Sequence, residues 1–247
     1  MNALMLNAGQ GKRLLPLTAS QPKCLLPVAG QRIIDWQLQE LAACGVRKVT
    51  VVVGFAASKV QEALAQACAR PSQIDTVHNP FFHVADNLVS CWVARQAMHD
   101  DFILLNGDTL FEAAVLRQLL ASEPAPITVA IGRKGAYDAD DMKVRCDGRT
   151  LLGIGKDLPP QETHGESIGM LIFRGAGPGL FREALEAAVM EPGARRLWYL
   201  SVINDLAQRG HVQAVSVDAQ QWMEIDFPQD LRKAHEFVAR WQIMERQ

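Results

Sequence analysis

A short apolar segment that runs into a loop of glycines and cations constrains the fold of this chain more than any other feature. Residues 4–7 are typical of a buried first strand, and two glycines separated by one residue follow it. Glycine lets successive backbone N–H groups converge on an anion without interference from Cβ. Lys12, Arg13 and Lys23 add positive charge close by. The stretch therefore predicts a polyphosphate site at the carboxyl edge of a sheet.

Two common phosphate-binding motifs do not match this loop. A Walker P-loop needs a glycine five residues before its Gly-Lys pair and Ser or Thr after it, but Leu6 and Arg13 stand there. The dinucleotide fingerprint needs a third glycine where this chain has Leu14. By spacing alone, a tight turn with solvated charges explains the loop as well as a phosphate site does.

Periodicity over the first half of the chain predicts alternating strands and helices. Apolar residues recur with helical spacing in two segments, 33–43 and 58–69. Strand-like apolar runs occur in three other segments, 48–53, 74–77 and 101–106. Such alternation favours a parallel, doubly wound sheet. Asp108 follows the last strand, which would place it at the same sheet edge as the glycine loop. Capping of a helix over 110–120 is the competing interpretation for Asp108.

From residue 126 the pattern changes to short strands with turns between them. Strand-like segments occur at 127–131, 142–146, 151–156, 167–173 and 212–217, and helical ones at 177–190, 195–208 and 229–244. Asp147 and Gly148 indicate a hairpin, so the sheet should become mixed in this half. We therefore expect an α/β chain with three layers, α/β/α, around a Rossmann-like sheet that is mixed but mostly parallel.

Composition argues against several classes of partner. A formal charge of −2 without a basic stripe argues against nucleic acid. No apolar segment approaches membrane-spanning length and nothing resembles a signal peptide, which predicts a cytoplasmic protein with no membrane partner. The histidines lack the spacing of zinc ligands. The cysteines are scattered without a C-x-x-C pair and indicate reduced thiols: Cys24, Cys44, Cys68, Cys91 and Cys146.

The order of the motifs resembles that of the nucleotidyltransferases that activate sugar phosphates and related phosphate esters. The matching motifs are Gly-x-Gly-x-Arg at 9–13, Pro-Leu-Thr at 16–18, Pro-Lys at 22–23, Asn-Gly-Asp at 106–108 and Glu-Ile-Asp at 224–226. Asn-x-x-Ser at 87–90 is similar to the branch that makes CDP-choline-like products. Asn7 departs from the pattern, because the family more often has alanine there.

This resemblance implies a nucleotidyltransferase (GT-A-like) fold and a Mg²⁺-dependent reaction. The enzyme would move CMP from CTP to a small phosphate or phosphonate ester such as phosphocholine, with release of pyrophosphate. Such an acceptor is largely dianionic at neutral pH, because its second pKa is about 6, and it needs no general base. We expect one domain over residues 1–247, with a nucleotide-binding half at 1–125 and an acceptor-binding half at 126–247.

The resemblance also implies the roles of individual residues. Arg13 and Lys23 would be catalytic, and Asp108 and Asp226 would hold Mg²⁺. The nucleotide would contact Leu6, Asn7, Ala8, Gly9, Gly11, Lys12, Asn87, Ser90 and Asp108. The acceptor would contact Lys143, Lys156, Glu166, Trp198 and Tyr199.

Taken singly, several of these residues have simpler interpretations. Asp226 could cap the final helix, as Asp108 could cap an earlier one. The charged acceptor residues could be solvated surface groups. For Trp198 and Tyr199 the preferred interpretation is a position in the core, and the second is an aromatic wall that binds a quaternary ammonium group.

Other functions are left open by the sequence. A transferase for sugar 1-phosphates or inositol phosphate could use CTP, UTP or dTTP. A non-catalytic nucleotide-binding module would keep the same fold, although binding alone does not require both the cations and the aspartates. A hydride-transfer enzyme is disfavoured by the missing third glycine. A homodimer is also left open.

Overall fold

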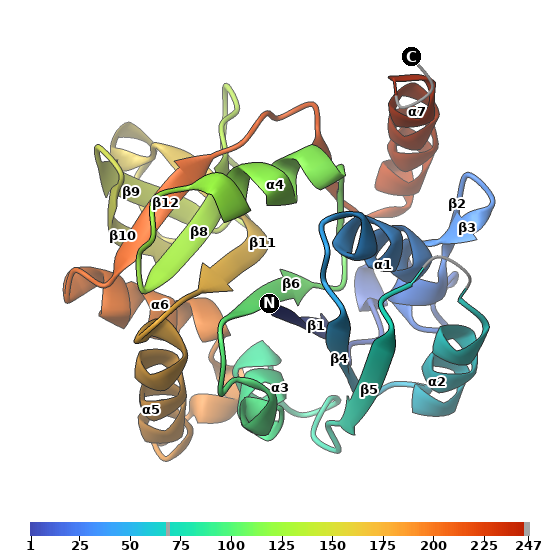
Figure 1. Ribbon diagram of the computed structural model, residues 1–247, viewed down its shortest axis with the longest axis horizontal. Helices are drawn as coiled ribbons and strands as arrows, with labels where there is room; N and C mark the ends of the chain where they lie inside the picture. Colours follow the sequence, from blue (N-terminus) through green and yellow to red (C-terminus); the bar gives the residue numbers. More distant parts are fainter. Residues whose placement is uncertain (68–69, 245–247) are drawn as a thin grey trace.

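The computed structural model describes residues 1–67 and 70–244, and a nine-stranded sheet runs through it (Figure 1). The strand order is β5-β4-β1-β6-β11-β8-β12-β10-β9. These strands are β1 Asn2–Asn7, β4 Lys48–Val53, β5 Gln73–His78, β6 Phe102–Asn106, β8 Ile127–Gly132, β9 Lys143–Asp147, β10 Thr150–Gly155, β11 Gly165–Phe173 and β12 Val212–Ser216. Two small sheets add β2 Pro27–Val28 with β3 Gln31–Arg32, and β7 Thr109–Phe111 with β13 Trp222–Glu224.

The sheet is parallel in the first half of the chain and mixed in the second, which confirms the predicted change in pairing, although parallel pairs do not predominate over the whole sheet. β1 pairs in parallel with β4 and β6, and β4 pairs in parallel with β5. β11 runs antiparallel to both β6 and β8, while β12 is parallel to β8. β9 and β10 form the predicted hairpin, with Gly148 at φ +56° in the turn.

Helices cover both faces of the sheet and produce three layers. The helices are α1 Ile33–Ala43, α2 Ala57–Gln66, α3 Asn87–Val93, α4 Ala113–Ala121, α5 Gly177–Val189, α6 Tyr199–Gln208 and α7 Pro228–Met244. Alternate residues of β1 belong to opposite cores: Leu4 packs with α3, α5 and α6, and Met5 packs with α1, α2 and α4. The period of two along each strand therefore places one apolar core on each face of the sheet.

Several elements differ from the predicted ones at their ends. The helix α3, which carries the Asn-x-x-Ser motif, is not among the segments predicted from periodicity; it ends at Val93 and is followed by a 3₁₀ turn over Arg95–Ala97. The helix expected over 58–69 corresponds to α2, which ends at Gln66, and Cys68 lies outside the described residues. The four cysteines that the structure describes are all unpaired.

A third apolar cluster attaches α7 to the elements that flank the candidate site. Trp36 of α1 and Trp241 of α7 pack with ring centroids 5.3 Å apart. Leu14, which follows Arg13, and Ile225, which precedes Asp226, are fully buried in the same cluster. Burial of these two neighbours fixes the positions from which Arg13 and Asp226 extend.

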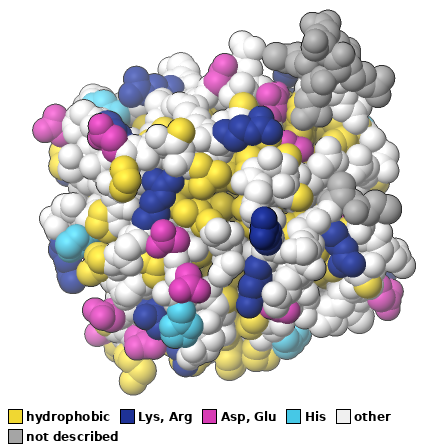
Figure 2. Space-filling model, in the orientation of Figure 1, with side chains coloured by type: hydrophobic (Ala, Val, Ile, Leu, Met, Phe, Trp, Pro, Cys, Tyr) yellow, Lys and Arg dark blue, Asp and Glu magenta, His cyan; other side chains and the backbone are white. Residues whose placement is uncertain are grey.

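Figure 2 shows lysine, arginine and acidic side chains interspersed over one face of the molecule. No helix within residues 1–67 and 70–244 is long and apolar enough to cross a membrane.

Candidate active site

The glycine loop after β1 is braced from within by the Pro-Leu-Thr motif. Thr18 Oγ1 donates a hydrogen bond of 2.8 Å to the carbonyl of Gly11, and Gln10 Nε2 donates one of 3.1 Å to the carbonyl of Thr18. Gly11 has φ +77°, and a Cβ at this position would lie 2.9 Å from Cβ of Lys23. The loop therefore needs glycine both for its backbone conformation and for the close approach of Lys23.

The turn that carries Asp108 lies directly beside the glycine loop. β6 pairs in parallel with β1, so both strands end at the same sheet edge. A Cβ on Gly107 would lie 1.7 Å from Asn7 Oδ1, which shows how closely the two strand ends approach. The interpretation of Asp108 as a helix cap is wrong, because β7 intervenes and Glu112 occupies the N-cap of α4.

Asp226 reaches the same edge from the far end of the chain. β13 pairs with β7, and the Ile225 N–H donates a 3.1 Å hydrogen bond to the carbonyl of Asp108. Asp230, not Asp226, accepts hydrogen bonds from the backbone at the start of α7, namely from the N–H groups of Asp226 at 3.1 Å and Phe227 at 2.8 Å. The capping interpretation of Asp226 is therefore wrong, and its carboxylate is available to other groups.

Lys23 joins the two aspartates. Its Nζ donates to Asp108 Oδ2 at 3.0 Å and to Asp226 Oδ1 at 2.7 Å, while Arg13 Nη2 lies 2.9 Å from Asp226 Oδ2. Burial lowers the pKa of Lys23, but the two carboxylates raise it by more, so its pKa stands above the ordinary value. Two cations and two carboxylates thus form one compact charge cluster.

Three polar residues in or beside this cluster have unusual environments. Asp108 Oδ1 is buried and has no hydrogen-bond partner among the described residues, and both amide atoms of Asn7 share that condition. Glu224, two residues before Asp226, has a pKa raised well above its ordinary value by burial and by the charges of Asp108 and Asp226. Glu224 lies within the Glu-Ile-Asp motif but is not one of the residues that the resemblance assigned to the site.

A cavity of about 430 Å³ opens on the charge cluster. Its wall includes many of the expected site residues: Leu6, Asn7, Ala8, Gly9, Gly11, Lys12, Arg13, Lys23, Asn87, Ser90, Asp108, Trp198 and Asp226. Lining residues that sequence reasoning missed are Gln10, Cys24, Phe82, Ala85, Asp86, Asn106 and Gly107. Most of these missed residues lie within or next to a recognised motif, and that position in the sequence could have identified them as site residues.

The Asn-x-x-Ser motif makes structural hydrogen bonds in the cavity wall. Asn87 Oδ1 accepts from the Tyr199 N–H at 2.9 Å and so satisfies a donor at the start of α6. Ser90 Oγ accepts from Asn79 Nδ2 at 3.0 Å. These bonds tie α3 to α6 and to the segment after β5.

The charged residues expected to bind the acceptor lie around the cavity without lining it. Lys143 is only 5% exposed and its Nζ donates to the carbonyl of Lys156 at 2.6 Å. Glu166 is also buried, and its carboxylate lies 2.9 Å from Lys134 Nζ. The surface-charge interpretation is therefore wrong for Lys143 and Glu166. Lys156 Nζ is 4.5 Å from the ring centroid of Trp198.

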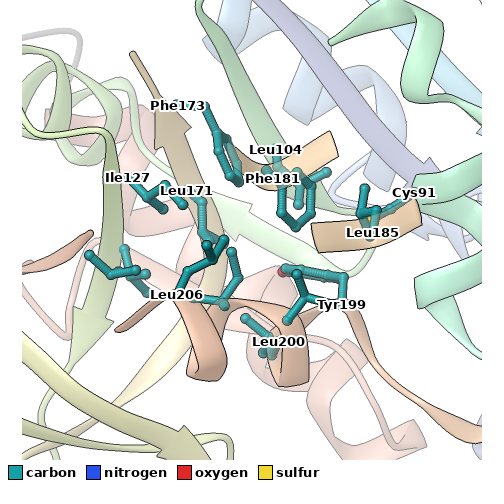
Figure 3. Close-up of a cluster of buried hydrophobic side chains, with 14 of the residues drawn as sticks. Cys91, Leu104, Ile127, Leu171, Phe173, Phe181, Leu185, Tyr199, Leu200 and Leu206 are labelled. Atoms are coloured by element: carbon teal, nitrogen blue, oxygen red, sulfur yellow. The ribbon is translucent and has the colours of Figure 1, made fainter. Parts of the chain in front are cut away.

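The two neighbouring aromatic residues have different positions. Tyr199 is completely buried among apolar side chains of α3, α5 and α6 (Figure 3), and its hydroxyl donates to Asn106 Oδ1 at 3.2 Å. Its position fits the core interpretation and gives its ring no access to a ligand. Trp198 lines the cavity and is 38% exposed. Of these two residues, Trp198 alone can present its ring to a ligand in the cavity.

Glu166 should make stability depend on pH. Burial, opposed by Lys134, raises the pKa of Glu166 from 4.5 to about 7. The folded state then binds a proton more tightly than the unfolded state. The contribution of Glu166 to stability is therefore complete below pH 4.5 and is lost as the pH rises to about 7, with a slope of up to about 1.4 kcal/mol per pH unit.

Urea unfolding of wild type and Glu166→Gln between pH 4 and pH 8 measures this contribution. We expect the stability difference between the two proteins to shift in favour of the glutamine variant as the pH rises through that window. Glu162→Gln, which changes an exposed carboxylate paired with Arg145, is the matched control. A difference that stays constant over the whole range for Glu166→Gln contradicts the raised pKa.

A model of the MobA-like NTP transferase domain matches residues 3–210. The CMP-5'-(3-aminopropyl)phosphonate synthase of Streptomyces rubellomurinus is 34% identical over 244 residues, which are 95% of this chain and 38% of that protein. The bifunctional IPC transferase and DIPP synthase of Aquifex aeolicus is 26% identical, over 96% of this chain and 52% of that protein. This chain therefore spans about half or less of the length of these two relatives.

Other similar proteins match over nearly their full length. The CTP:phosphoglutamine cytidylyltransferase of Campylobacter jejuni is 25% identical over 94% of this chain and 98% of its own. The inositol-1-phosphate CTP transferase of T. maritima superposes with a TM-score of 0.80 at 20% identity, covering 96% of this chain and 94% of that one. The CTP:phosphocholine cytidylyltransferase of Streptococcus pneumoniae gives 0.78 at 18% identity, covering 96% and 98%. These superpositions show a shared nucleotidyltransferase fold.

Proposed function

The chain belongs to the MobA-like NTP transferase family, and on that premise we propose that it transfers CMP from CTP to a small phosphate or phosphonate acceptor and releases pyrophosphate. The names of its relatives support this choice, because they include a CMP-phosphonate synthase and a phosphoglutamine cytidylyltransferase. The solved structures of similar fold include CTP-dependent transferases for inositol phosphate and phosphocholine.

One observation of the structure carries the proposal. Arg13 and Lys23 lie at the wall of a cavity beside two carboxylates, and a loop with a left-handed glycine places backbone N–H groups near them. Cations with preorganised positions are what transfer of a nucleotidyl group requires, because negative charge gathers on the α-phosphoryl group and on the departing pyrophosphate. A site for a neutral ligand would have no use for this arrangement.

The reaction needs positioning and charge neutralisation more than proton transfer. The acceptor phosphate is largely dianionic at neutral pH, and one of its oxygens attacks the α-phosphorus while the bond to pyrophosphate breaks. Lys23 and Arg13 exchange their contacts with Asp108 and Asp226 for contacts with phosphate oxygens in this proposal. They reduce the repulsion between the two anions and stabilise the leaving group. The glycine loop holds the triphosphate in line for attack.

The residues at the cluster fit a bound Mg²⁺ ion. Carboxylate oxygens of Asp108 and Asp226 already converge on one cation, the Lys23 ammonium group, and Asp108 Oδ1 is buried without a partner among the described residues. The structure shows no group of three or more His, Cys, Asp and Glu within residues 1–67 and 70–244 that could hold a metal. Mg²⁺ commonly uses only one or two carboxylates, with phosphates completing its shell. When bound, Mg²⁺ would withdraw charge from the phosphates.

The two halves of the chain would divide the substrates between them. In this proposal residues 1–125 bind the nucleotide through the glycine loop, Asn87 and Ser90, and residues 126–247 bind the acceptor. Trp198 lines the cavity and its ring already attracts one ammonium group, that of Lys156, so the ring suits an ammonium-bearing acceptor that takes the place of Lys156. Lys143, Lys156 and Glu166 would act from the layer behind this wall.

Pyrophosphate release tests the proposal. CTP, UTP, dTTP and GTP are each combined with phosphocholine, 2-aminoethylphosphonate, inositol phosphate and glucose 1-phosphate, with Mg²⁺ and with EDTA in its place. We expect release with CTP and a phosphate or phosphonate acceptor, and none with EDTA. Release with UTP or dTTP and glucose 1-phosphate would assign the chain to sugar-phosphate transfer. Mg²⁺-independent nucleotide binding without release would indicate a binding module.

A further inference from the structure

An acidic residue from the loop between β8 and β9 lies at the rim of the proposed active site. Residues 133–142 connect the two strands, and within this loop Asp140 is largely exposed. Its Oδ2 lies 3.7 Å from Arg13 Nη1, and its Oδ1 accepts a 3.1 Å hydrogen bond from Lys156 Nζ. Asp140 thus joins a cation of the glycine loop to a cation of the acceptor half.

The loop is held at both sides of Asp140 by further contacts. Lys134 Nζ lies 2.7 Å from Asp141 and 2.9 Å from Glu166 on β11. The Asp138 N–H donates to Asp141 Oδ2 at 2.6 Å. Lys134 holds the pKa of Asp141 below its ordinary value even though burial raises it. These contacts therefore hold the loop in the conformation that places Asp140 at the rim of the cavity.

The two cations that Asp140 contacts are otherwise placed to receive anionic groups. Arg13 lines the cavity, and Lys156 covers the ring of Trp198, which also lines it. A carboxylate offers these cations the same kind of oxygen ligand that a phosphate does. A substrate phosphate and Asp140 cannot both occupy the same donor groups of Arg13 and Lys156.

We propose that Asp140 is an internal anionic latch that competes with substrate phosphates for Arg13 and Lys156. This inference rests on the proposed function, because the phosphates of the nucleotide and acceptor are the groups that release the latch. In the unliganded protein Asp140 holds the loop across the rim of the cavity. On binding, phosphate oxygens replace the carboxylate and the loop detaches. When pyrophosphate and product leave, Asp140 returns to Arg13 and Lys156 and the loop closes again over the rim.

Isothermal titration calorimetry of the protein with inorganic pyrophosphate, in the presence of Mg²⁺, measures the competition between Asp140 and phosphate groups. Asp140→Asn should bind pyrophosphate about twofold to tenfold more tightly than wild type, because the ion pairs it removes are partly exposed and individually weak. Asp140→Glu keeps the charge and should stay near wild type. Asp138→Asn removes the same charge from the same loop, at an exposed residue without an ion pair in the described structure, and should also leave the affinity near wild type.

Hydrogen exchange of the loop separates displacement from a simple effect of charge. In wild type, pyrophosphate should speed the exchange of amides in residues 133–142, and in Asp140→Asn the exchange should be fast without pyrophosphate. Equal affinity of wild type and Asp140→Asn overturns the latch while leaving the proposed function intact. Slower exchange of the loop in the presence of pyrophosphate also overturns it. Absence of pyrophosphate binding and of turnover in wild type contradicts both the function and the latch.

Discussion

Lys23→Ala should lower kcat by about a hundredfold or more while the protein stays folded. The ammonium group is buried, contacts both Asp108 and Asp226, and would pass to the phosphates of the substrate. Loss of one preorganised charge of this kind typically removes roughly 2.7–4 kcal/mol of transition-state stabilisation. Pyrophosphate release under saturating substrates gives kcat, and a thermal melt reports the fold.

A matched control and a metal titration make this result specific. Lys48→Ala removes an exposed ammonium group, 3.5 Å from Asp75, and should leave turnover near wild type. Mn²⁺ binding by Lys23→Ala, followed by its EPR signal, should be retained, because the two carboxylates lose their internal cation and attract another more strongly. Turnover near wild type in folded Lys23→Ala would remove Lys23 from the catalytic machinery.

Asp108→Asn should weaken both metal binding and turnover. The amide has nearly the size of the carboxylate but lacks its charge, so the turn after β6 keeps its shape. We expect turnover to fall about a hundredfold. Mn²⁺ affinity should fall by at least about tenfold, a loss that even indirect changes at metal sites produce. EPR titration in the absence of substrates measures that affinity independently of activity.

Asp75→Asn provides the comparison for this second prediction. Asp75 lies on β5 and pairs with Lys48, so it carries the same charge at a distant edge of the sheet. The Asp75→Asn variant should bind Mn²⁺ with the same affinity as the wild type. If Asp108→Asn bound Mn²⁺ with wild-type affinity, Asp108 would not be a metal ligand. Together, the lysine and aspartate variants separate loss of the cation from loss of the metal.

The fold class and the first half of the site could be predicted because they depend on local pattern. Continuous apolar strand-like runs that alternate with helical segments favour a parallel sheet between helical layers. In such a sheet neighbouring strands end at one edge, and so the glycine loop after β1 and Asp108 after β6 had to be near each other. The left-handed Gly11 and the bracing Thr18 belong to the same short segment as the motif itself.

Residues whose surroundings come from distant parts of the chain could not be placed in this way. Lys143 and Glu166 suit exposed positions by residue type, yet pairing of β9 with β11 buries both. Tyr199 and Trp198 are neighbours in sequence, but the start of α6 turns one into the core and the other toward the cavity. Asp140 carries no motif at all, and only the path of its loop brings it to Arg13.

The sequence by itself thus determined the layers of the fold, the anion-binding loop and the residue types available for the chemistry. Periodicity and turn chemistry are properties of short segments, and these features need nothing more. The tertiary structure decided that Lys23 would hold Asp108 and Asp226 together, since Asp226 is 203 residues away from Lys23. That contact depends on the pairing of β13 with β7 and on the burial of Ile225. Both are interactions between residues far apart in the sequence, and they form only when the core packs.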